Sequence, residues 1–328
     1  MGKLIVIGGG ELKDLQKALF GLGIKVDSAK GMDGGATNMV YLIESGKDKF
    51  VLKMCNGLNR GQVQKLINLL LKINFQRDIT TKPLNKKPIR LSKDYGYVYN
   101  FFNGNPFRVA KVKNRFYKFG KILGEVDKSM LRLKSPIGTT KLKEIISNLK
   151  GYNSKVLWIA NNFRGGRAIK EGMLNSANKG LSLVDPEFYK GCRVSFIHGD
   201  LNMDNVIYNG KSNLYFLIDM TSLNNDLLVN ELTLPFSYML TNSDKENKKR
   251  IKSMLNGYES EINLTIREKK AIVDLVILRR IGELRWLIDQ HNSGRMNNKN
   301  FKFWIEDTLK YLKISVDHYA RIKEHCLN

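Results

Sequence analysis

The middle of the chain carries two polar residues whose types and spacing suit proton transfer beside a metal ion. Asp200 follows the apolar run Phe196-Ile197, which predicts a loop after a buried strand. A carboxylate held rigidly in such a loop can act as a general base toward a hydroxyl group. Asn205 comes five residues later, so in a short loop its amide oxygen can reach a cation beside that carboxylate.

A predicted β-hairpin follows and brings a second carboxylate to the same place. Its strands are the β-rich runs 206–208 and 214–218, and Asn209-Gly210 gives a turn signal between them. The hairpin would return Asp219 to Asn205. Two oxygen ligands on a rigid ribbon suit Mg²⁺, which keeps several waters and binds phosphates directly. Transfer of a phosphoryl group from ATP needs this combination of a base and magnesium ligands.

The whole pattern resembles the aminoglycoside phosphotransferase and choline kinase superfamily. It reads His198-Gly199-Asp200, then Asn205, a hairpin and an isoleucine before Asp219. The resemblance implies an α+β, bilobal protein-kinase-like fold with a small β-rich N-terminal lobe and a larger, mainly helical C-terminal lobe. It further implies ATP and Mg²⁺ as cofactors, Asp200 as catalytic base, Asn205 and Asp219 as metal ligands, and His198 as a support of the loop. Gly199 is typical of the small-molecule kinases, whereas protein kinases usually carry arginine there.

The N-terminal part resembles the nucleotide-binding half of the same superfamily. A glycine-containing segment precedes a predicted hairpin of strands 39–43 and 49–53, where the superfamily places its phosphate-covering loop. The run 50–53 resembles the strand whose lysine contacts the ATP phosphates, and 97–102 resembles the hinge whose backbone meets the adenine. The nucleotide-binding residues expected on this basis are Gly34, Gly35, Thr37, Asn38, Lys53, Tyr99 and Phe101.

The sequence departs from the superfamily at the partner of its strand lysine. Relatives often pair that lysine with a glutamate on the next helix, but no glutamate occurs between Cys55 and Asp94. Gln62, Gln64 or a water could orient Lys53 instead. This departure keeps open a weak or unusual activity, and also a non-catalytic nucleotide-binding protein of the spore-coat type.

Further residues match the superfamily less closely. Glu231 stands where an aspartate usually follows the metal-binding aspartate, and we expect it to steady the catalytic loop. The helix 119–127 carries Asp127 where relatives have histidine. Arg279-Arg280 and Arg285-Trp286 fall on a predicted helix of the C-terminal lobe, where relatives often build acceptor pockets, but solvated basic residues are the simpler interpretation. Core packing is the expectation for the three tryptophans, Trp158, Trp286 and Trp304.

The order of predicted elements divides the chain into a strand-rich first part and a helical second part. A strand at 95–102 is followed by the breaker Asn103-Gly104-Asn105-Pro106. We therefore expect a nucleotide-binding lobe at 1–102, a hinge or linker at 103–106, and a catalytic and acceptor-binding lobe at 107–328. Helix signals in this last part are Asn114 as a cap, a capping box at 265–268 and a final helix at 301–324.

Composition limits the class of protein. The 328 residues include 42% hydrophobic and 26% charged residues, and no apolar run is long enough to span a bilayer. The three cysteines, Cys55, Cys192 and Cys326, are widely spaced and indicate reduced thiols, so we expect a cytoplasmic protein. The net charge of +24 indicates an anionic partner or simply solvated surface lysines. Its basic clusters are not interleaved with aromatic residues, so nucleic acid is not favoured as a partner.

The function expected from these features is transfer of the ATP γ-phosphate to a hydroxyl of a small molecule. Candidate acceptors are an aminoglycoside-type antibiotic, a sugar or an amino alcohol, although a charge of +24 would repel polycationic aminoglycosides unless the cleft is locally acidic. A bacterial stress-type protein Ser/Thr kinase on the same fold is the alternative within enzymes, suggested by residues 18–28. The expected partners are a nucleotide and the acceptor, and the oligomeric state stays open.

Overall fold

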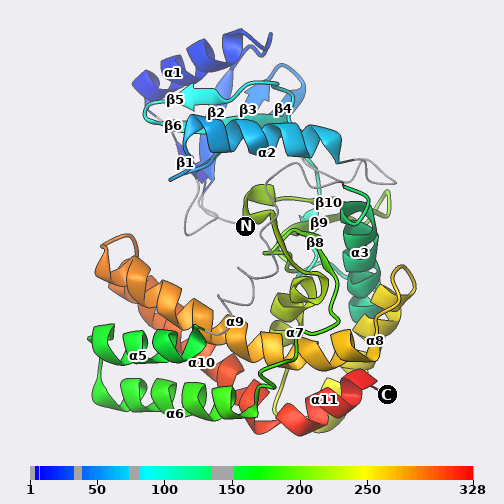
Figure 1. Ribbon diagram of the computed structural model, residues 1–328. Coiled ribbons are helices and arrows are strands. Elements are labelled where there is room, and N and C mark those ends of the chain that lie inside the picture. Colours follow the sequence, from blue (N-terminus) through cyan, green and yellow to red (C-terminus); the bar gives the residue numbers. More distant parts are fainter. Residues whose placement is uncertain (1–3, 7, 33–38, 74–81, 134–150, 328) are drawn as a thin grey trace. The chain divides into compact units, whose positions relative to one another are not determined.

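The computed structural model describes all residues except 1–3, 7, 33–38, 74–81, 134–150 and 328. The chain forms two compact units, one of Met1–Lys111 with Asp204–Thr221 and one of Val112–Met203 with Ser222–Asn328. The first unit holds most of the strands and the second is mainly helical (Figure 1), which confirms the expected α+β fold class. The first unit extends past the expected linker 103–106 and also takes in the hairpin after Asn205. The assignment of lobes to nucleotide and acceptor stays a prediction.

The first unit is built on a six-stranded antiparallel sheet. Its strand order is β1-β2-β3-β4-β6-β5. The predicted hairpin of β3 and β4 is confirmed, with Val40 paired to Lys53 and a turn at Gly46, whose φ of 58° favours glycine. The strands are β1 (Leu4–Val6), β2 (Ser28–Met32), β3 (Val40–Ser45), β4 (Asp48–Met54), β5 (Ile89–Leu91) and β6 (Asp94–Asn100).

Two helices pack on this sheet. Helix α1 (Gly9–Phe20) buries Leu15 and Leu19 in a core with Leu52 and Met54 of β4. Side chains alternate along a strand, so Lys53 points to the opposite face of the sheet from Leu52 and Met54. Helix α2 (Arg60–Lys72) begins with a capping box and contacts β6. The sheet therefore presents Lys53 on the face that α1 does not cover.

A smaller three-stranded ribbon completes the first unit. It has the order β10-β9-β7 and consists of β7 (Asn105–Pro106), β9 (Val206–Asn209) and β10 (Leu214–Leu217). The predicted hairpin is confirmed, but its turn is not a two-residue Asn-Gly turn. Asn209 Oδ1 accepts hydrogen bonds from the N–H groups of Lys211 and Ser212, and the left-handed residue is Asn213 at φ 54°.

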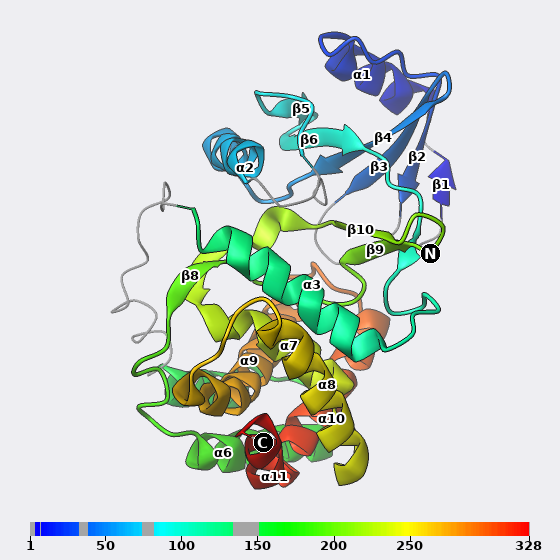
Figure 2. The same cartoon turned by 90° about the vertical axis from the view of Figure 1, so that its right-hand side faces the viewer.

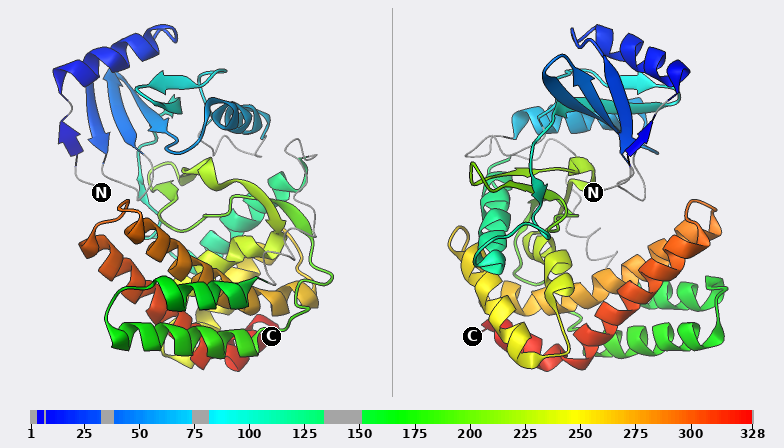
Figure 3. Two further views of the ribbon diagram at one scale, coloured as in Figure 1. Left: turned by 60° about the vertical axis from the view of Figure 1, so that its left-hand side comes forward. Right: turned by 180° about the vertical axis from the view of Figure 1, so that it is seen from behind.

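The second unit packs its helices around α9. Helices α5 and α6 lie side by side and both contact α9 (Figure 3). Two short strands, β8 (Val194–Ile197) and β11 (Asn224–Leu227), pair antiparallel, and 3₁₀ helices cover Met220–Ser222 and Leu228–Leu232. The α-helices are α3 (Arg115–Met130), α5 (Tyr152–Asn162), α6 (Arg167–Leu183), α7 (Thr233–Met239), α8 (Asp244–Glu259), α9 (Ile266–Asn292), α10 (Asn298–Asp317) and α11 (Tyr319–Leu327).

Glycines allow α3 and α8 to pack in close contact (Figure 2). A Cβ on Gly120 of α3 would lie 2.0 Å from the carbonyl oxygen of Met254, and one on Gly257 of α8 would lie 2.0 Å from that of Tyr117. Both distances are far inside van der Waals contact. The two helix backbones therefore approach as they do only because neither position carries a side chain.

Helix ends agree with the sequence in one case and differ in two. The capping box of Thr265 and Glu268 is confirmed. Helix α3 begins directly after Asn114 as expected, but this residue has φ 54° and its side chain makes no capping hydrogen bond. The final helix expected at 301–324 is two helices, because α10 ends at Asp317 and α11 begins at Tyr319. Among the described residues, no helix is long and apolar enough to cross a membrane.

Candidate active site

The loop after β8 makes a tight turn at a glycine. Gly199 has φ 78°, a conformation that side-chain-bearing residues rarely adopt. A Cβ there would also lie 2.7 Å from the carbonyl oxygen of Ser222 and 2.9 Å from Nδ2 of Asn224. Both the turn and the close approach therefore require glycine, which gives a structural reason for the His-Gly-Asp form of the motif.

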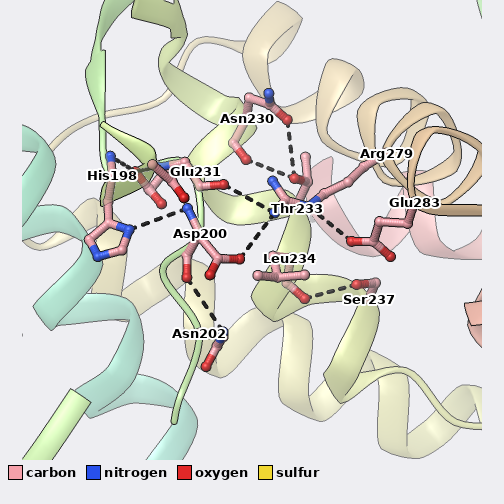
Figure 4. A network of polar contacts seen from close by, with 12 residues as sticks. His198, Asp200, Asn202, Asn230, Glu231, Thr233, Leu234, Ser237, Arg279 and Glu283 are labelled. Carbon is pink, nitrogen blue, oxygen red and sulfur yellow. Dashed lines mark hydrogen bonds and ion pairs between the residues drawn. The ribbon is translucent and has the colours of Figure 1, made fainter. Parts of the chain in front are cut away.

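Two side chains of the second unit hold this loop in place (Figure 4). The buried Glu231 carboxylate accepts hydrogen bonds from the backbone N–H groups of His198 and Gly199, the latter at 3.2 Å. The Asp200 N–H donates to Nδ1 of the buried His198 ring at 3.2 Å. Hydrogen bonds to a buried carboxylate are strong and directional, so the backbone leading into Asp200 is fixed. These contacts are the geometry expected of supporting residues, while the roles themselves stay predictions.

An arginine that the sequence did not single out as functional lies against Asp200. Arg279 of α9 places Nη2 3.6 Å from the Asp200 carboxylate and 3.1 Å from the Gly199 carbonyl oxygen. Its Nε lies 3.3 Å from Glu283 of the same helix, which holds the arginine side chain in place (Figure 4). The contacts of Nη2 therefore connect α9 to the loop. The interpretation of Arg279 as a solvated surface residue is therefore wrong. The i,i+4 spacing of Arg279 and Glu283 was the signal available in the sequence.

The neighbouring Arg280 is also not solvated. Its side chain is 1% exposed, donates to Ser237 and Glu283, and lies over the ring of Tyr238 at 4.5 Å. The expectation of core packing for the tryptophans fails at Trp286 and Trp304, which are 41% and 38% exposed. Helix α9 thus buries Arg280, whose two terminal nitrogens donate to Glu283 and Ser237 inside the protein, and exposes Trp286.

A second buried carboxyl lies near Glu231. Burial raises the pKa of Asp127 well above its usual range, and the charge of Glu231 raises it further. Burial also raises the pKa of Glu231, although the hydrogen bonds that it accepts from backbone N–H groups lower this pKa in part. The Tyr258 hydroxyl donates to Asp127 at 2.7 Å, yet Oδ1 of Asp127 and Oε1 of Glu231 find no hydrogen-bond partner in the described part of the chain. A proton on Asp127 is the least costly arrangement, since Glu231 must stay an acceptor for the loop.

In the first unit, Lys53 pairs with Asp219. Lys53 is 2% exposed, and its ammonium donates to Oδ1 of Asp219, which also accepts a hydrogen bond from the Thr221 hydroxyl at 2.6 Å. The glutamines proposed to orient Lys53 are engaged elsewhere. Gln62 forms the capping box of α2, and Gln64 donates to Asn68 and to the Lys86 carbonyl. The carboxylate of Asp219 therefore takes the place of the missing helix glutamate in this structure.

The hairpin places Asn205 beside Asp219. The Ile218 N–H donates to the Asn205 carbonyl at 2.9 Å, which extends the β9–β10 ladder by one step to the residue before Asp219. Asp219 itself has φ 62°, a left-handed conformation that aspartate tolerates better than most residues. An amide and a carboxylate oxygen are hard ligands of the kind Mg²⁺ prefers. Among the described residues, no group of three His, Cys, Asp or Glu side chains is arranged to hold a metal ion. Mg²⁺ needs only one or two carboxylates besides phosphates and water, so Asn205 and Asp219 fit as its ligands.

The remaining nucleotide-binding predictions have mixed outcomes. Tyr99 is buried on the same face of the sheet as Lys53, since Val51 pairs with Tyr99 and Lys53 with Tyr97. The Phe101 N–H donates to the Lys49 carbonyl at 2.9 Å, so this donor is already used by the sheet. Four further residues lie outside the described residues, namely Gly34, Gly35, Thr37 and Asn38.

The predicted site residues are thus distributed over both units. Lys53, Asn205 and Asp219 gather in the first unit, and the loop carrying Asp200 is built in the second. The chain passes from Asp200 to Asn205 within five residues. The first group can hold a phosphate and a cation, and the second presents a carboxylate that can take a proton.

Comparison with known proteins gives matches in structure only. Neither the family models nor the curated proteins compared with the chain match its sequence. Among solved structures, the chain is similar to a microcompartment-associated aminopropanol kinase, with a TM-score of 0.66 and 14% identity over 96% of this chain and 99% of the other. It is also similar to spectinomycin phosphotransferase in complex with ADP and spectinomycin, with a TM-score of 0.57 and 16% identity over 95% of this chain and 98% of the other.

A third similar structure is a bacterial choline kinase. The choline kinase LicA from Streptococcus pneumoniae matches with a TM-score of 0.58 and 17% identity, over 92% of this chain and 98% of the other. All three neighbours are kinases or phosphotransferases that act on small molecules, and they match over nearly their full length. The chain therefore shares the protein-kinase-like fold of these small-molecule kinases.

Proposed function

We propose that this chain is an ATP-dependent phosphotransferase that moves the γ-phosphate to a hydroxyl of a small molecule. The observation that carries the proposal is the anchoring of Asp200. Its loop is held by His198 and by the buried Glu231, so a carboxylate is presented in one fixed geometry. A fixed carboxylate is what a general base requires, because the acceptor hydroxyl must meet it at hydrogen-bond distance.

Within this proposal, Asp200 accepts the proton of the acceptor hydroxyl as that oxygen attacks the γ-phosphorus. Asn205 and Asp219 would hold Mg²⁺, which when bound neutralises phosphate charge. Lys53 lies beside Asp219 and supplies a second positive charge for the phosphates. Arg279 contacts both Asp200 and the Gly199 carbonyl, and so limits the movement of the base.

The test compares two substitutions in the same segment. Asp200→Asn keeps the size of the side chain but removes the proton acceptor, so ADP release with a panel of hydroxylated acceptors should fall about 100-fold or more. Asp204→Asn is the matched control, because its partner Arg108 is an exposed residue and their ion pair contributes little. ATP binding in the presence of Mg²⁺, measured by calorimetry, should be retained in both variants.

Two results would contradict the proposal. Equal turnover by the wild type and by Asp200→Asn would show that Asp200 is not the general base. Binding of Mg²⁺ and ATP without turnover of any acceptor would instead favour a non-catalytic nucleotide-binding protein.

A further inference from the structure

A pair of cations lies along the contact between α5 and α9, outside the residues used above. Tyr152, Lys155 and Trp158 recur every three residues on one face of α5. The Lys155 ammonium lies over the Tyr152 ring, 3.6 Å from its centre, and the Arg285 guanidinium of α9 lies over the Trp158 ring at 5.3 Å. Two aromatic rings therefore hold two positive charges at one helix–helix contact.

These two cations lie on contacting helices and influence each other electrostatically. Burial lowers the pKa of Lys155, and the charge of Arg285 lowers it further. No ion pair joins either side chain to a carboxylate within the part of the chain that the structure describes. By contrast, Arg279 and Arg280 on the same helix share Glu283. Like charges that approach in a partly buried place repel each other, and an anion bound between them would remove that repulsion.

Arg285 of this pair lies on the same helix as Arg279, which contacts the proposed base. Arg285 follows Arg279 by six residues on α9, which corresponds to a rise of about 9 Å. Tyr152 lies between them along α9, since its hydroxyl is 3.7 Å from the position of a Cβ on Gly282. A molecule bound to Lys155 and Arg285 could therefore extend along α9 toward Asp200.

We propose that Lys155 and Arg285 bind an anionic group, a carboxylate or a phosphate, of the acceptor. This inference rests on the proposed function and specifies the chemical class of its substrate. The Tyr152 and Trp158 rings fix the two cations by their faces and leave N–H donors for the anion. An anionic acceptor would also be attracted by the net charge of +24.

A binding test that does not depend on turnover uses Trp158 as its reporter. Trp286 and Trp304 are exposed, so both can be replaced by phenylalanine to leave a single tryptophan at the proposed site. Sodium phosphate and sodium malate are then titrated at constant ionic strength. A saturable change in Trp158 fluorescence is expected, with affinity reduced about tenfold or more in Lys155→Gln and in Arg285→Gln. The matched control is Lys310→Gln, since Lys310 also lies over a tyrosine ring, that of Tyr311.

The kinetic arm separates this inference from the proposed function. Acceptors are compared in pairs that differ by one anionic group, such as glycerol with glycerate and with glycerol 3-phosphate. Preference for the anionic member, with its KM raised about tenfold in Arg285→Gln and the KM for ATP unchanged, would support the inference. Preference for neutral or cationic acceptors would overturn it and leave the phosphotransferase proposal intact. Absence of any turnover would count against the proposed function. The fluorescence titration would still decide whether the cation pair binds anions, and an unsaturable signal in that titration would overturn the inference.

Discussion

The buried carboxyls Asp127 and Glu231 should make the second unit lose stability as the pH rises. The pKa of each is raised by burial, so the folded state keeps a proton that the unfolded chain releases at lower pH. Between the ordinary and the raised pKa, the folded state binds more protons than the unfolded state. The free energy of unfolding is therefore highest at low pH in this window and falls toward neutral pH.

The size of the effect follows from the number of protons. One extra proton in the folded state changes the free energy of unfolding by about 1.4 kcal/mol per pH unit, so the loss between about pH 5 and about pH 7 is about 2–3 kcal/mol. Asp127→Asn replaces the protonated acid by a neutral amide of the same shape that can still accept the Tyr258 hydrogen bond. It should reduce the pH slope by about half or more, because Glu231 no longer has a second carboxyl beside it.

Urea unfolding at a series of pH values, followed by tryptophan fluorescence, measures this slope. All three tryptophans belong to the second unit, so the signal reports on the unit that contains the two carboxyls. Glu306→Gln is a suitable control because it removes an exposed carboxyl on α10 of the same unit and should leave the slope unchanged. An identical slope in the wild type and in Asp127→Asn would refute the reasoning.

Three further substitutions test other contacts. Gly120→Ala places a Cβ against the α8 backbone and should destabilise the protein by about 1–3 kcal/mol in thermal unfolding. Gly172→Ala on α6, where a Cβ has room, should be neutral or slightly stabilising, and equal effects of the two substitutions would contradict the close packing of α3 and α8. Lys53→Met should weaken Mg²⁺-dependent ATP binding about tenfold or more by calorimetry, since it removes the positive charge beside the proposed metal site, and unchanged affinity would argue against that role. Arg193→Ala should lower the free energy of unfolding in urea by about 1–3 kcal/mol, because the fully buried Glu268 loses its hydrogen-bonded partner. Partial exposure of the arginine reduces the effect, and a change below about 0.5 kcal/mol would show that water replaces the arginine.

The sequence predicted most of the local structure that positions the site. The hairpins at β3–β4 and β9–β10 and the capping box of α9 depend on residues close in the chain, whose turn and capping preferences act locally. The motif from His198 to Asp219 was visible for the same reason. At Asn114 the sequence located the start of the helix but not the conformation of the cap, since the residue is left-handed and lacks the extended backbone that a side-chain cap uses.

The partners of the polar groups could not be predicted, because they come from distant parts of the chain. Lys53 meets Asp219 from a strand far away in sequence, so the missing helix glutamate gave no indication of its partner. Arg279 reaches Asp200 because α9 packs beside the loop that carries Asp200, although its sequence context predicted a solvated residue on an amphipathic helix. The types and spacing of residues in the sequence determined which chemistry is proposed for the chain. The tertiary structure decided which charges are neutralised, since burial and distance, and not residue type, set the energy of an ion pair.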